Sequence, residues 1–270
     1  MSDIPADLAP DRVCAALRTR MLGRSLEIKA ATGSTMDDAR LVATHRPEGF
    51  VTVADHQAEG RGSHGRIWES PAGTDLYFSV LLRPPVALAS LGALTLAMGV
   101  GVAEAADALL GRSVARVKWP NDVWLSGGAK CAGILVESRA SGAIADFVVV
   151  GVGLNVNRRS FPEGLAAGAT SLSIESGMPF DRAEVLAEIL ASLERWYDRF
   201  VERGAAPIVQ AVEARLAMRG RRVRCGGVEG RLEGLSPEGG LRIADDRGER
   251  VVMAGRLELI GPPTGASPSQ

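Results

Sequence analysis

Cysteine is scarce in this 270-residue chain, and the three that occur, Cys14, Cys131 and Cys225, lie far apart. They form neither an even disulfide set nor a metal-ligand spacing, which excludes a fold built on disulfides and favours a reducing compartment. We therefore expect a cytoplasmic protein.

Net charge is also nearly absent: 31 Lys and Arg residues stand against 32 Asp and Glu residues. Such a chain has no overall field to attract nucleic acid, so no nucleic-acid partner is expected.

Segments for export or membrane insertion are lacking as well. The first seven residues are acidic and carry no apolar core, which excludes a secretory signal. The long uncharged run, residues 87–103, is shorter than the roughly 20 residues that a membrane span needs. Glu104 and Asp107 continue its helical pattern, so we predict a buried helix and no membrane association.

Motifs for covalent or metal-dependent hydrolysis are missing too. His45, His56 and His64 match no zinc spacing. There is no Gly-x-Ser-x-Gly, no Cys-x-x-Cys and no supported pair of nucleophile and base. The chemistry that remains is electrostatic catalysis on a bound anion.

The segments that are present predict an α+β fold. β-rich stretches at residues 50–54, 76–82, 115–119 and 147–157, several joined by short turns, indicate a mainly antiparallel sheet with helices on one face. From Gly220, four or five short strands in about forty residues predict a small β-barrel. We expect a catalytic domain at 1–218, the barrel at 219–262 and a disordered tail at 263–270, which is rich in Pro, Gly and Ser.

The most informative stretch is Lys118-Trp119-Pro120-Asn121-Asp122 with the strand that starts at Lys130. A turn at residues 126–129 predicts a hairpin that brings two lysines, an amide and a carboxylate near one sheet surface, a set that suits an anionic ligand. Solvated lysines are the commoner alternative. Asn121 and Asp122 either cap their own turn or help to hold the Mg²⁺ of a nucleotide.

Two glycine-rich segments also indicate ligand binding. The loop at 57–73 contains Gly60-Arg61-Gly62-Ser63-His64-Gly65-Arg66, whose amides and guanidinium groups could close around a phosphate or carboxylate. It is not a Walker loop, and a solvated flexible loop is the alternative. Gly151-Val152-Gly153 lacks the third glycine and the helix of a dinucleotide fingerprint. Its glycines permit a bulge or a close approach by a ligand, or merely a twist of the sheet.

Taken together, these motifs resemble the biotin protein ligases in order and approximate spacing. The matching segments are Ser34-Thr35-Met36, residues 57–66, Trp68-Glu69-Ser70-Pro71, residues 118–122, residues 130–137 and Gly151-Val152-Gly153-Leu154-Asn155. The resemblance implies a biotin/lipoate ligase-like catalytic domain with an SH3-like barrel. It also implies a two-step reaction, in which biotin and ATP give biotinyl-5'-adenylate and a lysine of the biotin carboxyl carrier protein of acetyl-CoA carboxylase then takes the biotinyl group.

The resemblance also implies roles for residues of this chain. Catalytic roles fall to Lys130, Arg61 and Lys118. Biotin contacts fall to Ser34, Thr35, Met36, Gln57, Arg61, Gly62, Ser63, Lys130 and Gly133. ATP or adenylate contacts fall to Arg66, Trp68, Trp119, Asn121 and Asn155, and a contact to Mg²⁺ falls to Asp122. ATP and Mg²⁺ are thus the implied cofactors.

Three residues depart from the family pattern. Met36 ends a triplet that is usually Ser-Thr-Asn, and Ser63 stands in the loop where arginine is common. With Ser63 in place of that arginine, the loop at residues 60–66, which would form a lid over the adenylate, should hold it less tightly. Asp75 replaces the asparagine often found before Leu-Tyr and adds a carboxylate near an anionic ligand.

Alternatives remain open at this stage. Only 33 residues precede Ser34, too few for the DNA-binding winged helix of some relatives, so we expect a ligase without repressor function. A lipoate ligase or octanoyltransferase shares the catalytic fold, and a non-catalytic sensor of biotin or its adenylate is a further alternative. A homodimer also stays open, because the family uses an exposed sheet edge both for self-pairing and for carrier docking.

Overall fold

A seven-stranded sheet forms the centre of the computed structural model, which describes residues 3–166 and 168–261. Its strands lie in the order β1-β2-β3-β7-β6-β5-β4. They are β1 (Leu26–Thr32), β2 (Val51–Gln57), β3 (Leu76–Leu82), β4 (Arg116–Lys118), β5 (Asp122–Trp124), β6 (Lys130–Ala140) and β7 (Ala145–Leu154). All neighbours are antiparallel except β1 and β2, which are parallel because a crossover containing α2 (Thr35–Leu41) joins them. The α+β class with a mainly antiparallel sheet is confirmed.

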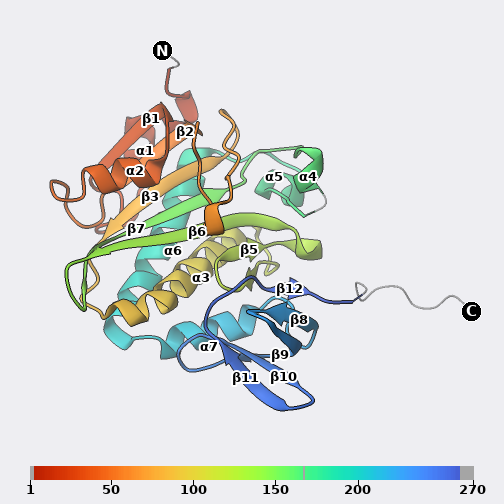
Figure 1. Ribbon diagram of the computed structural model, residues 1–270. Helices are drawn as coiled ribbons and strands as arrows, with labels where there is room; N and C mark the ends of the chain where they lie inside the picture. Colours follow the sequence, from red (N-terminus) through yellow and green to blue (C-terminus); the bar gives the residue numbers. More distant parts are fainter. Residues whose placement is uncertain (1–2, 167, 262–270) are drawn as a thin grey trace, which may run out of the picture.

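Helices cover both faces of this sheet. In β3, Phe78 and Val80 point into a large core shared with α3 (Leu91–Leu110) and α6 (Arg182–Arg203). Leu81 points the other way, into a smaller cluster with Met36 and Ala39 of α2. The expected arrangement of helices on one face therefore holds for α3 and α6, while α2 lies opposite them (Figure 1). The remaining helices are α1 (Pro10–Ala16), α4 (Glu163–Ala166), α5 (Leu172–Ser176) and α7 (Ala206–Arg215).

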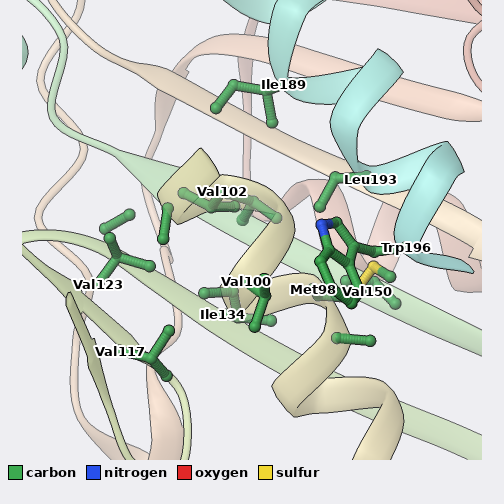
Figure 2. Close-up of a cluster of buried hydrophobic side chains, with 14 of the residues drawn as sticks. Met98, Val100, Val102, Val117, Val123, Ile134, Val150, Ile189, Leu193 and Trp196 are labelled. Atoms are coloured by element: carbon green, nitrogen blue, oxygen red, sulfur yellow. The ribbon is translucent and has the colours of Figure 1, made fainter. Parts of the chain in front are cut away.

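The apolar helix α3 lies between the sheet and α6. Residues 88–110 are long and apolar enough to cross a membrane by length and composition, but the structure buries most of the apolar window inside the protein. Figure 2 shows Val100 and Met98 of α3 among strand side chains and Leu193 of α6. Glu104 accepts a hydrogen bond from the Trp196 indole at 2.8 Å, which satisfies an acidic side chain in this apolar setting.

A second sheet of five antiparallel strands follows α7, in the order β11-β10-β9-β8-β12. Its strands are β8 (Arg222–Cys225), β9 (Val228–Leu235), β10 (Leu241–Asp245), β11 (Gly248–Val252) and β12 (Glu258–Leu259). They fall within the range 219–262 expected for a small barrel, and the sheet packs beside α7 and the β4–β5 hairpin (Figure 1). The predicted tail, 263–270, lies outside the described residues.

A buried arginine fastens the N-terminal segment to the sheet. Arg182 at the start of α6 is 1% exposed and donates two 2.7 Å hydrogen bonds to Asp7, beside a 2.6 Å bond to Asp55. A further bond reaches the carbonyl of Asp75 at 3.2 Å. Asp181 caps the same helix by accepting bonds from the amides of Ala183 and Glu184.

Replacing Arg182 by methionine is expected to lower the free energy of unfolding by about 3–5 kcal/mol, because Asp55 would stay buried without its cation. The hydrogen bond from Arg182 is the leading cause that lowers the pKa of Asp7 below 3.8. The Asp7 carboxylate therefore contributes its full stabilisation above the pKa that it has in the unfolded chain. That stabilisation is lost as the pH falls through the lower pKa that it has in the folded protein. In urea unfolding, the free energy of unfolding of the variant should fall less than that of the wild-type protein as the pH drops below about 4. An equal fall in both proteins would show that Arg182 does not set the pKa of Asp7.

Candidate active site

A cavity of about 290 Å³ opens at one end of the seven-stranded sheet. Five segments line it: the start of α2, the end of β2 with the loop that follows it, the turn between β4 and β5, the facing strands β6 and β7, and the chain after β7. The predicted site residues on its lining are Ser34, Thr35, Met36, Gln57, Arg61, Gly62, Ser63, Arg66, Trp68, Asn121, Lys130, Gly133 and Asn155. Residues separated by up to 121 positions in sequence thus meet at one cavity.

A polar network forms one wall, where β2 ends and α2 begins. The Gln57 carboxamide oxygen accepts hydrogen bonds from the Thr35 amide at 2.9 Å and from its hydroxyl at 3.1 Å. The Gln57 amide nitrogen donates to Ser70 at 3.0 Å, and the Thr35 hydroxyl also contacts that of Ser79 at 2.9 Å. These bonds fix the orientation of both predicted biotin-contact side chains, which a ligand could then use without further ordering.

The floor consists of strand glycines covered by two large side chains. A Cβ atom at Gly151 would lie 2.2 Å from the Met36 sulfur, and one at Gly153 would lie 2.3 Å from the Trp68 ring. Gly133, which pairs with Gly153 across β6 and β7, would bring a Cβ within 2.9 Å of the same ring. The glycines therefore serve close approach, and in this structure the approaching groups are the protein's own indole and thioether.

Two lysines and one carboxylate lie beside this floor. Lys130 Nζ lies 2.6 Å from Asp122 Oδ1, a contact not aligned as a hydrogen bond, and 5.0 Å from the centre of the Trp68 ring. Lys118 Nζ lies 3.7 Å from Asp122 Oδ2. Burial is the leading cause that lowers the pKa of Lys118, and Asp122 opposes it. The three groups together carry one net positive charge, with Lys130 on the cavity lining and Lys118 behind it.

The prediction that Asp122 holds Mg²⁺ does not fit this arrangement. Both of its oxygens face lysine ammonium groups, and no cluster of three or more His, Cys, Asp or Glu side chains suited to a metal ion occurs among the described residues. A magnesium ion needs carboxylate or carbonyl oxygens free to bind it. Asp122 instead orients the two lysines.

The loop at 57–73 is more ordered than the expected open glycine loop. Gly62 donates to the Arg66 carbonyl at 2.7 Å, and an isolated bridge joins Arg61 to Ile67, which makes a tight hairpin. The Arg61 guanidinium binds both oxygens of Asp37 on α2, at 2.9 and 3.0 Å. Arg66 folds back onto Ser63, donating to its hydroxyl at 2.9 Å. Both predicted phosphate-binding arginines thus engage groups of the protein itself.

Trp119 is the clearest error of placement among the predicted ligand contacts. It does not line the cavity: its side chain is buried, and its indole nitrogen donates at 2.9 Å to the carbonyl of Gly239 in the turn between β9 and β10. The residue joins the Lys118–Asp122 hairpin to the C-terminal strands. Trp119 is therefore not placed to contact an adenine bound in the cavity.

Trp119→Phe should leave the KM for ATP within about twofold of the wild-type value, because the ring does not reach the cavity. The variant should lose about 1 kcal/mol of stability with the bond to Gly239. Steady-state kinetics and urea unfolding measure the two effects. A tenfold or larger rise in the KM for ATP would show that Trp119 does contact the nucleotide.

The chain after β7 supplies cavity residues that sequence reasoning missed. Arg158 and Phe161 line the cavity, with the guanidinium carbon 5.1 Å from the ring centre. Asn155 holds this segment by donating to Thr170 at 2.8 Å, and Lys130 pairs with Ala169 in a parallel bridge. The adjacency of Arg158 to the Gly-Leu-Asn motif was the available signal, but only the fold brings it to the cavity.

Comparison with known proteins agrees with this geometry. Residues 29–155 match the Biotin/lipoate A/B protein ligase family. The chain is 36% identical over 261 residues to the biotin--[acetyl-CoA-carboxylase] ligase of Mycobacterium tuberculosis, covering 90% of this chain and 93% of that one. It is 34% identical over 262 residues to the bifunctional ligase/repressor BirA of Bacillus spizizenii, covering 94% and 80%. The structure of the Aquifex aeolicus biotin protein ligase with biotin and ATP superposes with a TM-score of 0.78 at 33% identity, covering 88% and 99%.

The fold, the cavity with Lys130 on its lining and the matching family model place the chain in the class of biotin/lipoate ligases. Within that class, the chain belongs to the biotin protein ligases.

Proposed function

We infer that this chain is an ATP-dependent ligase that activates biotin as biotinyl-5'-adenylate and transfers it to a lysine of the biotin carboxyl carrier protein of acetyl-CoA carboxylase. The observation that carries this conclusion is Lys130, whose ammonium lies on the lining of a cavity floored by glycines and walled by the Thr35 and Gln57 network. Relatives named for the same activity match nearly the whole chain.

In the first step a biotin carboxylate oxygen attacks the α-phosphate of ATP, and the bond to the β-phosphate breaks to release pyrophosphate. Two negative charges at about 4 Å and an effective dielectric near 20 repel by roughly 4 kcal/mol, or about three decades of rate. Lys130 offsets that repulsion directly. Asp122 holds Lys130 in place, and Lys118 keeps the cluster net positive. The carboxylate itself is the nucleophile, so no protein nucleophile is needed.

In the second step the amine of a carrier lysine attacks the acyl carbon of the adenylate, which forms an amide and releases AMP and a proton. The apolar body of biotin suits Leu135 on the cavity lining, which lies on the same face of the sheet as Met36 and the strand glycines. Thr35 and Gln57 provide fixed polar groups for one end of the molecule. The Arg61 hairpin closes over the ligand once its guanidinium leaves Asp37.

Three further properties are part of the proposal. ATP brings Mg²⁺ on its own phosphates, since a nucleotide-bound ion needs only one or two protein ligands. The protein acts in the cytoplasm, where three dispersed cysteines would stay reduced. Two copies associate through an exposed sheet edge, as expected of the family.

Transfer of biotin to a purified carboxyl-carrier domain, with ATP and Mg²⁺, tests the function. Labelling with biotin and not with lipoate is expected, together with pyrophosphate release that depends on biotin. Labelling with lipoate instead would assign the chain to the lipoate branch. Tight binding of biotin without pyrophosphate release would identify a sensor.

A further inference from the structure

The loop at 57–73 is fastened very differently at its two ends. Its first half, residues 60–66, is held to the rest of the protein by Arg61, which pairs with Asp37 at 2.9 Å and with Glu137 at 3.8 Å; these side chains are 37–39% exposed. Its second half is tied down at several residues: Glu69 by Arg158, Ser70 by His56 at 2.7 Å and Gln57 at 3.0 Å, Pro71 by the Tyr77 hydroxyl at 3.0 Å and Gly73 by Asp55 at 2.9 Å. The second half is therefore a fixed base for the movable first half.

Arg158 is the centre of that base. Its Nη1 donates to the Glu69 carboxylate at 2.8 Å and its Nη2 to the Glu69 carbonyl at 3.1 Å. Its Nε donates to Asp75 Oδ2 at 2.7 Å. The guanidinium side chain is only 8% exposed, although an arginine on a cavity lining could otherwise reach solvent. One side chain thus binds both the main chain and the side chain of a single loop residue.

Asp75 provides the charge that keeps Arg158 in this position. It is fully buried; one oxygen accepts from the Val156 amide at 2.9 Å, and the other binds Arg158 and the Tyr77 hydroxyl. Burial opposes the charged form of Arg158, but Asp75 prevails and the pKa of the guanidinium is raised. This explains the departure from the usual asparagine: an uncharged amide would leave Arg158 without a buried counter-ion.

By holding Glu69, Arg158 also holds the main chain next to Trp68. The Trp68 ring lies against Gly133 and Gly153 and 5.0 Å from Lys130 Nζ, but its indole nitrogen is buried without a hydrogen-bond partner, so no hydrogen bond of its own side chain holds the ring. The ring keeps its place because the main chain on either side is held, by the Trp68 amide bond to Gly60 and by Arg158 on Glu69.

We propose that Arg158, held by Asp75, is a positioning residue that fixes Glu69 and so keeps the Trp68 indole in place for nucleotide binding. The inference rests on the proposed function, and it makes Asp75 and Arg158 a coupled pair that secures the base of the lid. Because Thr35 keeps its bond to Ser79 on β3, outside the loop, and orients Gln57 through a second bond, the effect falls on ATP more than on biotin.

The test compares Arg158→Met, Asp75→Asn and the double variant with a matched control, Arg215→Met. Arg215 pairs with the largely buried Asp107 between α7 and α3, away from the cavity lining. Arg158→Met should raise the KM for ATP by about 10- to 100-fold and the KM for biotin by less than about threefold. Arg215→Met should lose stability while keeping both KM values.

The double variant separates positioning from stability. Removing both charges should restore most of the stability that Arg158→Met loses, since no carboxylate is left buried without a cation. The raised KM for ATP should persist, because Glu69 then lacks both hydrogen bonds that it receives from Arg158. A double variant with a wild-type KM for ATP would overturn the proposal, as would an unchanged KM in Arg158→Met. Wild-type protein that releases no pyrophosphate with biotin and ATP would instead refute the proposed function.

Discussion

Lys130→Ala is expected to slow biotin-dependent pyrophosphate release by about three decades, since the repulsion of roughly 4 kcal/mol between carboxylate and phosphate would lose its nearest counter-charge. The effect should fall mainly on kcat, because the charge is most valuable where the two anions meet. Single-turnover formation of the adenylate measures it directly.

Lys29→Ala provides the matched control for that loss. Lys29 lies on β1, where it binds Asp38 at 3.0 Å, and does not line the cavity. Its removal should leave the rate unchanged within about twofold. If Lys130→Ala retained a tenth or more of the wild-type rate, the main charge compensation would have to come from another group, and Lys118 would be the next residue to replace.

Ser63→Arg is expected to slow the escape of free adenylate by roughly 10- to 150-fold, the range given by a charged hydrogen bond of about 1.5–3 kcal/mol. Ser63 lies on the cavity lining, and its hydroxyl contacts only Arg66 of the same hairpin among the hydrogen bonds of the described residues. A longer cationic side chain there could reach the ligand once the lid closes.

Adenylate released from the protein in the absence of a carrier is the quantity to follow. Ser63→Gln is the control, since it lengthens the side chain without a charge and should recover only a small part of the retention. Equal release from Ser63→Arg and the wild-type protein would show that the serine does not limit how well this lid holds the intermediate.

Sequence patterns captured the elements whose local signals are strong. The apolar run at residues 76–82 has the bounds of β3, and the turn predicted at residues 126–129 joins β5 to β6 as an antiparallel hairpin. The parallel pairing of β1 with β2 was missed, because strand direction depends on the crossover through α2 rather than on either strand alone.

The site was predictable where motifs are continuous and less so where tertiary contacts decide. Thirteen predicted residues line the cavity, but Trp119 faces Gly239, 120 residues away, and Asp122 faces two lysines. Arg158 was overlooked because its partner Asp75 lies 83 residues earlier. Side-chain direction and distant pairing are properties of the packed fold, which neither composition nor spacing encodes locally.

The scarcity of lysine bears on self-labelling. An acyl adenylate that escapes its lid acylates unprotonated amines, whereas guanidinium groups remain protonated and inert. Only three of the 31 basic residues are lysines; two of them, Lys118 and Lys130, flank Asp122, and the third is paired with Asp38. A surface whose positive charge is almost wholly arginine therefore offers its own reactive product few targets, which preserves the biotinyl group for the carrier.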